Sequence, residues 1–269
     1  MRRIAPLELA ETAWDNVGIL VENPRPLAGS KTVLLTIDLT DAVLQEAVDQ
    51  HASVIVAYHP PIFRPLKSLR LDDGKAAIVL KAVVNGISIY SPHTALDAAQ
   101  QGVNDWLIDG LTTGIAGTKA PIKPTPSTTG SAQTGMGRVF RFDDSAKGIT
   151  VDELVLRTKK HLGLPQVRLA AVSQDHVIRS IGVCAGSGAS LLAGLKVDAF
   201  VTGELGHHEA LAANALGTSV VLGEHTNTER GYLRLHLQGT LQEMLQADQA
   251  FADAKVIVSQ IDRDPLVIV

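Results

Sequence analysis

Two residues near the end of the chain have the chemistry and spacing of a metal-ligand pair. His225 and Glu229 lie four residues apart, after the strand-like run Ser219–Leu222 and at the start of a helix-forming segment. If the helix starts near Thr226, both side chains point to one face at its N-terminal end. Neutral imidazole and carboxylate suit divalent cations such as zinc, manganese or iron. The same residues also fit a plain helix start, with Thr226 or Asn227 as the N-cap and Glu229 in the first turn.

Three more ligand-type residues follow predicted strands in the first half of the chain. His59 follows the run 53–58, and His93 and Asp97 follow the run 87–91. Ligands of parallel sheets collect at the carboxyl ends of strands, which is where these residues fall. Each residue also has a simpler explanation. His59 can cap a strand end, Asp97 can be an N-cap, and His93 can be an interior histidine with one hydrogen-bond partner.

The chain carries one short motif twice. His-Thr-x-x-acid occurs at 93–97 and again at 225–229, each time after a helix, a glycine and a strand. The repeat predicts an α/β protein with two similar lobes facing each other across a metal-binding cleft, each lobe donating a histidine and a carboxylate. His59, Asp97, His225 and Glu229 together form a set of nitrogen and oxygen donors. The two acids, Asp97 and Glu229, could bridge two ions, as in two-metal hydrolytic sites.

The elements that must position these residues alternate between strands and helices. The predicted strands are 19–22, 32–38, 53–58, 87–91, 136–142, 166–172, 178–185, 198–202, 219–222 and 255–260. The predicted helices are 1–11, 41–51, 75–85, 103–111, 151–162, one from the Gly/Ser turn at 186–190 to about 196, 209–216 and 228–247. The alternation implies βα units with right-handed crossovers and mixed or mostly parallel sheets.

The segment 112–135 has a different composition from the rest of the chain. It is rich in Thr, Ser, Gly, Pro and Ala and poor in large apolar residues, which predicts a long loop or linker. The predicted organisation is therefore a first α/β lobe at 1–111, this linker, and a second α/β lobe at 136–269. Whether terminal strands are exchanged between the lobes is left open.

Composition excludes several classes of protein. A net charge of −4 and an aromatic content of 4% in 269 residues argue against direct nucleic-acid binding. The single cysteine, Cys184, excludes an intramolecular disulfide and a thiolate metal cluster. No apolar run reaches the roughly 18 residues that span a bilayer, and the N-terminus lacks the apolar core of a signal peptide. We expect a soluble cytoplasmic protein without membrane association; nuclear or mitochondrial presence is left open.

Six motifs occur in order along nearly the whole chain. They are Trp14-Asp15-Asn16-Val17-Gly18, Tyr58-His59-Pro60-Pro61-Ile62-Phe63, Ser91-Pro92-His93-Thr94-Ala95-Leu96-Asp97, Gly102-Val103-Asn104-Asp105-Trp106-Leu107, Thr202-Gly203-Glu204 with His207-His208, and His225-Thr226-Asn227-Thr228-Glu229-Arg230-Gly231. Together they resemble the NGG-one interacting factor three family, whose bacterial members are often labelled GTP cyclohydrolase I type II. The version here looks most like the short eukaryotic, fungal-type members.

The resemblance implies two similar α/β lobes, a dinuclear divalent-metal site and often a ring-shaped homohexamer built from dimers. It assigns four metal ligands: His59, Asp97, His225 and Glu229. Many members have two consecutive histidines where this chain has Tyr58-His59, so Tyr58 is expected to be a weak metal ligand, to donate a hydrogen bond to a ligand, or to line the cleft. His93 is expected to support the site. Members usually begin with a helix before the segment at 4–6, so a shortened first helix or gene model is also expected.

For activity, the resemblance implies a metal-dependent hydrolase that acts on a nucleotide or related heterocycle, with purine ring opening as the concrete version. In the family pattern Glu204, His207 and His208 lie beside the site and could shuttle protons, although they also fit a plain helix start. The turn at 186–188 could hold a phosphate through its N–H groups, or be an ordinary strand-to-helix turn. The alternatives are a metal-stabilised scaffold that acts through protein partners and a metal-binding housekeeping or chaperone protein.

Overall fold

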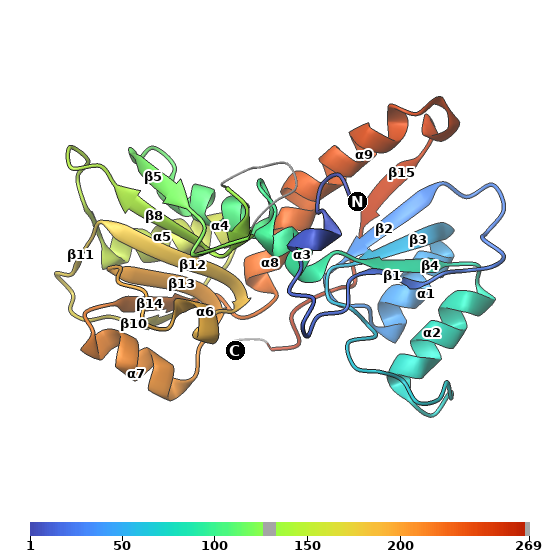
Figure 1. Ribbon diagram of the computed structural model, residues 1–269, viewed down its shortest axis with the longest axis horizontal. Helices are drawn as coiled ribbons and strands as arrows, with labels where there is room; N and C mark the ends of the chain where they lie inside the picture. The colour runs from blue at the N-terminus through green and yellow to red at the C-terminus, as the bar shows by residue number, and fades with distance from the viewer. Residues whose placement is uncertain (126–132, 267–269) are drawn as a thin grey trace. The chain divides into compact units, whose positions relative to one another are not determined.

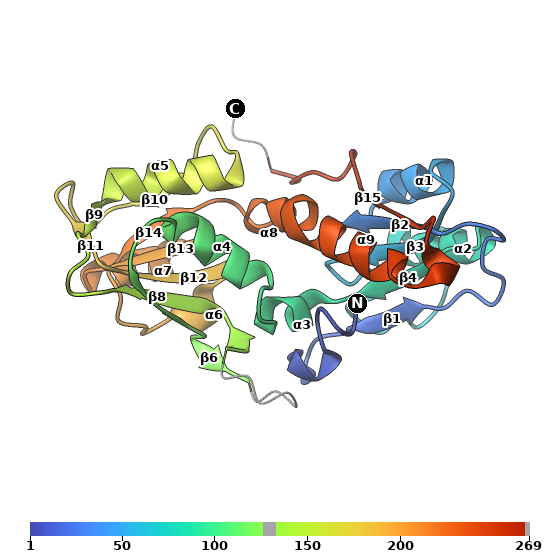
Figure 2. The same cartoon turned by 90° about the horizontal axis from the view of Figure 1, so that it is seen from above.

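The computed structural model describes residues 1–125 and 133–266 of the chain. They form two compact units, drawn in Figures 1 and 2. The first unit comprises Met1–Leu96 and Tyr232–Arg263, and the second comprises Asp97–Gly231 and the segment from Asp264. Each unit is built on one main sheet with helices packed against it.

The sheet of the first unit has five strands in the order β1-β4-β3-β2-β15. Their bounds are β1 (Gly18–Val21), β2 (Thr32–Thr36), β3 (Ala52–Ala57), β4 (Ser88–Ser91) and β15 (Lys255–Val258). The four strands from β4 to β15 are parallel, and β1 pairs antiparallel with β4 at the edge. The carboxyl ends of the parallel strands therefore lie on the same side of the sheet, and His59 and His93 follow β3 and β4 there.

Helices cover both faces of this sheet. They are α1 (Asp41–Asp49), α2 (Gly74–Val84) and α9 (Gln238–Gln246). Figure 1 shows α1 and α2 on one face and α9 on the other. Leu34, Ile55 and Ile89 of the central strands are fully buried, as expected for a parallel sheet covered on both faces. Thr40 and Asp73 cap α1 and α2 by accepting N–H groups of their first turns.

The second unit has a six-stranded mixed sheet in the order β10-β14-β13-β12-β8-β5. Its strands are β5 (Gly117–Ala120), β8 (Arg138–Phe142), β10 (Arg168–Ala170), β12 (Ser180–Ser187), β13 (Ala199–Glu204) and β14 (Ser219–Leu222). The three central strands, β12 to β14, are parallel, and the others pair antiparallel. Two small sheets pair β6 (Lys123–Pro124) with β7 (Gly135–Met136), and β9 (Ile149–Thr150) with β11 (Val177–Ile178).

The helices of the second unit also lie on both sides of its sheet. They are α4 (Val103–Thr112), α5 (Val151–Leu162), α6 (Ala189–Leu192) and α7 (His207–Ala215). α4 packs against α5 and β12, whereas α7 packs against β14 from the opposite face (Figure 1). The chain passes between the units within two short helices, α3 (His93–Ala98) and α8 (Asn227–Tyr232), which carry the repeated His-Thr-x-x-acid motif.

The predicted α/β class is confirmed, with a mixed sheet in each unit, but the unit boundaries differ from the predicted lobes. The chain leaves the first unit after Leu96 and returns to it for Tyr232–Arg263. The return occurs because β15 pairs with β2, where Lys255 lies opposite Thr32. The segment predicted as a loop or linker, 112–135, contributes β5 to the main sheet and forms β6 and part of β7; residues 126–132 of it lie outside the described residues.

Helix lengths differ from expectation in three places. The helix predicted at 228–247 is interrupted by a π-helical segment, Leu233–Leu237, between α8 and α9. The helix predicted to reach about 196 ends at Leu192, before Gly194 takes a left-handed conformation with φ of 76°. The first eleven residues contain only a 3₁₀ turn, Leu7–Leu9. Among the described residues, no helix combines the length and apolar character needed to cross a membrane.

Candidate metal centre

In the first unit, a carboxylate holds the imidazole of His59. β2 and β3 are parallel neighbours, and the N–H of His59 extends their pairing by donating to the carbonyl of Ile37 at 3.0 Å. This brings His59 Nδ1 to 2.9 Å from Oδ1 of Asp38, two residues beyond β2. In the neutral tautomer Nδ1–H donates to the carboxylate and Nε2 carries the lone pair, which is the form in which histidine binds a cation.

His93 is held in the same way by a second carboxylate of the first unit. Its Nδ1 lies 2.6 Å from Oδ1 of Asp15, and the N–H of Thr94 donates to Oδ2 at 3.2 Å. Burial by itself raises the pKa of Asp15, but the hydrogen bond and charge of His93 and the hydrogen bonds from Thr94 and Asn16 outweigh it and lower the pKa below its usual value. The centroid of the His93 ring lies 5.8 Å from that of the Tyr58 ring and 5.5 Å from that of the His59 ring. His93 and the buried Tyr58 therefore pack around His59.

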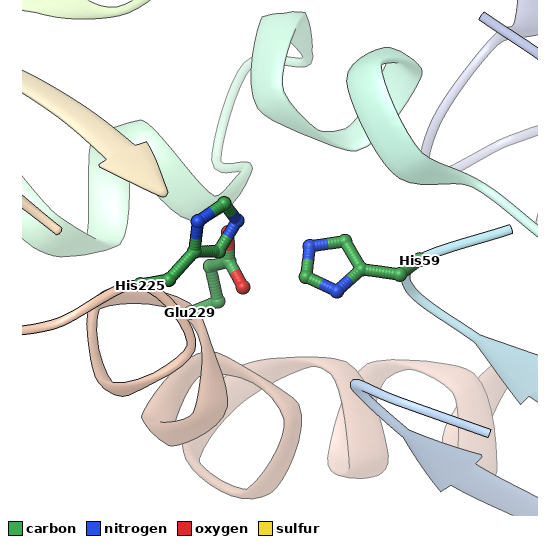
Figure 3. Close-up of side chains that lie close together, drawn as sticks. All are labelled: His59, His225 and Glu229. Atoms are coloured by element: carbon green, nitrogen blue, oxygen red, sulfur yellow. The ribbon is translucent and has the colours of Figure 1, made fainter. Parts of the chain in front are cut away.

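In the second unit, the predicted pair His225 and Glu229 does come together. His225 follows β14, and Glu229 lies in the first turn of α8. The distance from His225 Nε2 to Glu229 Oε1 is 3.5 Å, and the Glu229 side chain is 3% exposed. Figure 3 shows the imidazole and the carboxylate facing each other. The pair combines an accessible ring with a carboxylate that the fold keeps out of water.

Glu204 orients the imidazole of His225. It is the last residue of β13, which runs parallel to β14, and its Oε2 lies 3.1 Å from His225 Nδ1. This repeats the relation between Asp38 and His59, because in each unit the carboxylate follows or ends the neighbouring parallel strand. Ligating histidines commonly donate their second N–H to a carboxylate, which fixes the tautomer and the ring orientation. His207 and His208, at the start of α7, are exposed and contact one another at 5.3 Å.

Gly186 leaves open the space beside the pair. A Cβ at this position would lie 2.6 Å from Glu229 Oε1 and 2.9 Å from His225 Nε2, and φ of 65° also favours glycine. Two of the N–H groups considered for phosphate binding have partners inside the fold. That of Gly186 donates to Thr228 Oγ1 at 2.8 Å, and that of Gly188 donates to the carbonyl of Glu204 at 3.4 Å. These bonds favour an ordinary strand-to-helix turn at 186–188, whose Gly186 gives access to the ligand pair.

Asp97 lies in the part of the second unit that also holds Glu229. Burial raises the pKa of the Cys184 thiol far above its usual range, and the negative charges of Asp97 and Glu229 raise it further. Asn104 fixes the backbone of this region, because its Nδ2 donates to the carbonyl of Asp97 at 3.1 Å and its Oδ1 accepts the N–H of Ala185 at 2.9 Å. Cys184 therefore stays a protonated thiol next to two carboxylates.

The donor set fits a divalent cation. His59 of the first unit and His225 and Glu229 of the second each offer one ligand atom of the required kind, and Figure 3 labels all three. When a nitrogen and an oxygen atom bind one tetrahedral ion with bonds of about 2.0–2.2 Å, these two atoms lie about 3.4 Å apart. The observed 3.5 Å between His225 Nε2 and Glu229 Oε1 matches that separation. Within the second unit, the described residues thus support one ligand pair for a metal ion, where the sequence predicted two ions.

Sequence reasoning did not single out three carboxylates that hold the motif residues: Asp15, Asp38 and Asp264. Asp38 had a detectable signal, because it ends the predicted strand next to the one that precedes His59. Asp15 and Asp264 had no local signal, since they meet Thr94 and Thr226 from 79 and 38 positions away. At the start of α8, Oδ2 of Asp264 accepts the Thr226 N–H at 3.2 Å and its hydroxyl at 2.8 Å.

These features define a class of protein, an α/β chain of two units with carboxylate-held histidines at the ends of parallel strands. The family model for Duf34/NIF3 (NGG1p interacting factor 3) matches residues 1–265, and the chain belongs to this family. It is 43% identical to Protein NIF3 homolog of Schizosaccharomyces pombe over 94% of this chain and 90% of that protein. It is 38% identical to NGG1-interacting factor 3 of Saccharomyces cerevisiae, over 98% and 92% of the two chains.

Solved structures support the same fold. The Staphylococcus aureus protein SA1388 aligns with a TM-score of 0.82 over 100% of this chain and 96% of that one. The sequences are 23% identical, so this likeness concerns the fold alone. The predicted family membership and its fungal affinity are therefore confirmed, whereas the reaction is not given by these comparisons.

Proposed function

We propose that this protein is a metal-dependent hydrolase that acts on a nucleotide or a related heterocycle. One observation carries the proposal: His225 and Glu229 lie at ligand separation in a space opened by Gly186, with the second nitrogen of His225 held by Glu204. A bound divalent ion lowers the pKa of its water and so supplies hydroxide near neutral pH. A pair that served only to start a helix would need neither the open space nor the carboxylate on Nδ1.

The chain's own residues have distinct roles in this proposal. The carboxylate of Glu204 lies 3.1 Å from Nδ1 of His225, where a negative charge favours a proton on Nδ1 and so leaves Nε2 to face the ion. Glu229 supplies a negative charge in a buried position, which strengthens its attraction for a cation. His207 and His208 are exposed and sit at the start of the helix that follows Glu204, so they are suited to exchange protons with solvent.

The ligand set that the family resemblance implies also contains His59 and Asp97. Asp38 supports this role of His59, because its carboxylate forms a hydrogen bond with Nδ1 and so favours the tautomer with the lone pair on Nε2. We propose that His59 completes the ligands of the first ion and that Asp97 binds a second ion together with Glu229. Because Tyr58 stands where many members of the family have another histidine, we expect the second ion to bind more weakly than the first.

Metal content tests the proposal first. Protein purified without a histidine tag should contain at least one zinc, manganese or iron ion per chain by elemental mass spectrometry. Glu229→Gln and His59→Ala should each lower that content. Glu243→Gln and His236→Ala are matched controls, because both side chains are exposed on the helical segment that continues α8. Metal content that is the same in all four variants would contradict the assignment.

Turnover tests the reaction. Formate release from GTP should be measured with protein loaded with manganese, iron or zinc, and Glu229→Gln should abolish it. Metal-loaded protein that turns over neither GTP nor other purine nucleotides would contradict the cyclohydrolase version.

The alternative function is a metal-stabilised protein that acts through partners. The observation favouring it is α7, where Leu211 and, directly after the helix, Leu216 are 55% and 76% exposed. The relative in Saccharomyces cerevisiae is named for an interaction with NGG1. Bound metal without turnover, together with impaired complex formation by Leu211→Glu, would favour this role. We also propose the homohexamer that the resemblance implies, which light scattering coupled to size-exclusion chromatography tests.

A further inference from the structure

The two His-Thr-x-x-acid motifs share a feature that lies outside both motifs. In the first, the N–H and the hydroxyl of Thr94 both donate to Oδ2 of Asp15, the N–H at 3.2 Å. In the second, the N–H and the hydroxyl of Thr226 both donate to Oδ2 of Asp264, at 3.2 and 2.8 Å. The same carboxylate oxygen therefore receives the same two groups in each unit, although the aspartates come from opposite ends of the chain.

Each aspartate is also held in place by its own segment. The N–H of Asn16 donates to Oδ1 of Asp15 at 2.7 Å, and the N–H of Leu266 donates to Oδ1 of Asp264 at 2.9 Å. One carboxylate oxygen thus fixes the local turn while the other is presented to the threonine. The arrangement occurs at both copies of the motif, whereas capping residues normally come from the residues next to the helix, and this points to a shared role for the two aspartates.

We propose that Asp264 is a positioning residue for the metal-ligand pair of the second unit. This inference rests on the proposed metal-binding function. Thr226 directly follows His225 and lies one turn before Arg230, whose Nη2 donates to the Thr226 hydroxyl at 2.8 Å. Asp264 therefore anchors the backbone between the two ligands, and through it the separation of His225 Nε2 from Glu229 Oε1.

Asp264 supplies hydrogen-bond acceptors at the start of α8. The first N–H groups of a helix have no partners within it, and a negative charge there is favourable. Without Asp264, the Thr226 N–H and hydroxyl lose a charge-assisted acceptor, and the first turn of α8 opens more often. Loss of groups that orient metal ligands typically weakens metal binding by about 10–100-fold.

The test compares Asp264→Ala with Asp264→Asn in the full chain. Asn keeps an oxygen that can accept from Thr226, so it should retain manganese affinity better than Ala, which should bind manganese about 10–100-fold more weakly. Asp253→Ala is the matched control, because that exposed aspartate makes a surface ion pair with Lys31. Wild-type manganese affinity in a folded Asp264→Ala variant, or an equal loss in Asp253→Ala, would overturn the inference.

A second measurement separates this inference from the proposed function. Hydrogen–deuterium exchange of metal-free protein should be faster at 226–230 in Asp264→Ala, and Asp15→Asn should leave that segment unchanged. Unchanged exchange at 226–230 in Asp264→Ala would overturn the positioning role. Wild-type protein that binds no metal at all would instead refute the proposed function, while faster exchange in Asp264→Ala would still support the anchoring of α8.

Discussion

Arg138 is the buried residue whose removal should damage the second unit most. Its side chain is 0% exposed, and its five N–H donors are all used at distances of 2.6–3.0 Å. Two bonds go to the two carboxylate oxygens of Asp105, and three go to the carbonyls of Ala99, Gly135 and Gly137. The guanidinium thus ties the start of β8 to the turn before α4, next to the asparagine that holds Asp97.

Replacing Arg138 with Met keeps most of the length but removes the charge and all five donors. Breaking a buried ion pair by removing one partner costs about 3–5 kcal/mol. We expect a value within this range, because three carbonyls also lose their donor while Lys119 still lies 3.0 Å from Asp105. Since small domains are stable by about 5–15 kcal/mol, this is a large fraction of the free energy of unfolding.

The pH dependence of this effect has a defined sign. Burial alone raises the pKa of Asp105, but Arg138 and Lys119 outweigh it and hold the pKa below 3.8. Because the folded pKa is lowered, the stabilisation by this carboxylate is present above the unfolded value and is lost as the pH falls through the folded value. Arg138→Met removes the two bonds that lower this pKa, so the loss of stability relative to wild type should be largest above the unfolded value and should shrink as the pH falls through the lowered folded value.

Urea unfolding followed by tryptophan fluorescence measures the effect. The 4% exposed Trp106 reports on the second unit once the exposed Trp14 is replaced by Phe. Arg141→Met is the matched control, because this exposed arginine lies on the same strand and makes a single bond to a backbone carbonyl; it should change the free energy of unfolding by less than about 1 kcal/mol. A cost below about 1 kcal/mol for Arg138→Met, or equal costs for the two variants, would refute the reasoning.

Three further predictions concern the proposed metal ligands and the residues around them. Glu204→Ala should weaken metal binding by about 10–100-fold without large loss of stability, as measured by metal titration and thermal melting, because the carboxylate only orients His225. Gly186→Ala should lower metal content and stability together, since its Cβ would fall 2.6 Å from Glu229 Oε1 and its φ is 65°; elemental analysis and circular dichroism check this. Tyr58→His should raise the metal content by up to one ion per chain, and unchanged content would place the missing ligand elsewhere.

Most of the strands were predictable because their signals are local. The apolar runs that became β2, β3, β12, β13 and β14 are long enough to be buried on both faces, and this property belongs to the segments themselves. The pairing of His225 with Glu229 was predictable for a similar reason, since a spacing of four residues at the start of a helix fixes which side chains share a face.

What could not be predicted depends on partners distant in sequence. The β5 segment contains Gly, Thr, Lys and Ala, and it becomes a strand because β8 offers it an edge. Asp264 meets Thr226 only after the chain has completed β15, so no local pattern marks it. Whether the terminal strand returns to the first unit was left open for the same reason, because the pairing of β15 with β2 joins segments far apart in the sequence.

The position of β15 has a consequence for synthesis on the ribosome. Most of the second unit is one continuous stretch, Asp97–Gly231, whereas the first unit needs residues made both before and after it. The nascent chain therefore holds β2 with an unpaired edge until the last strand emerges, and an open edge is a template for pairing with other chains. Translation that stalls before Lys255 should release aggregation-prone chains whose second unit is nevertheless largely complete.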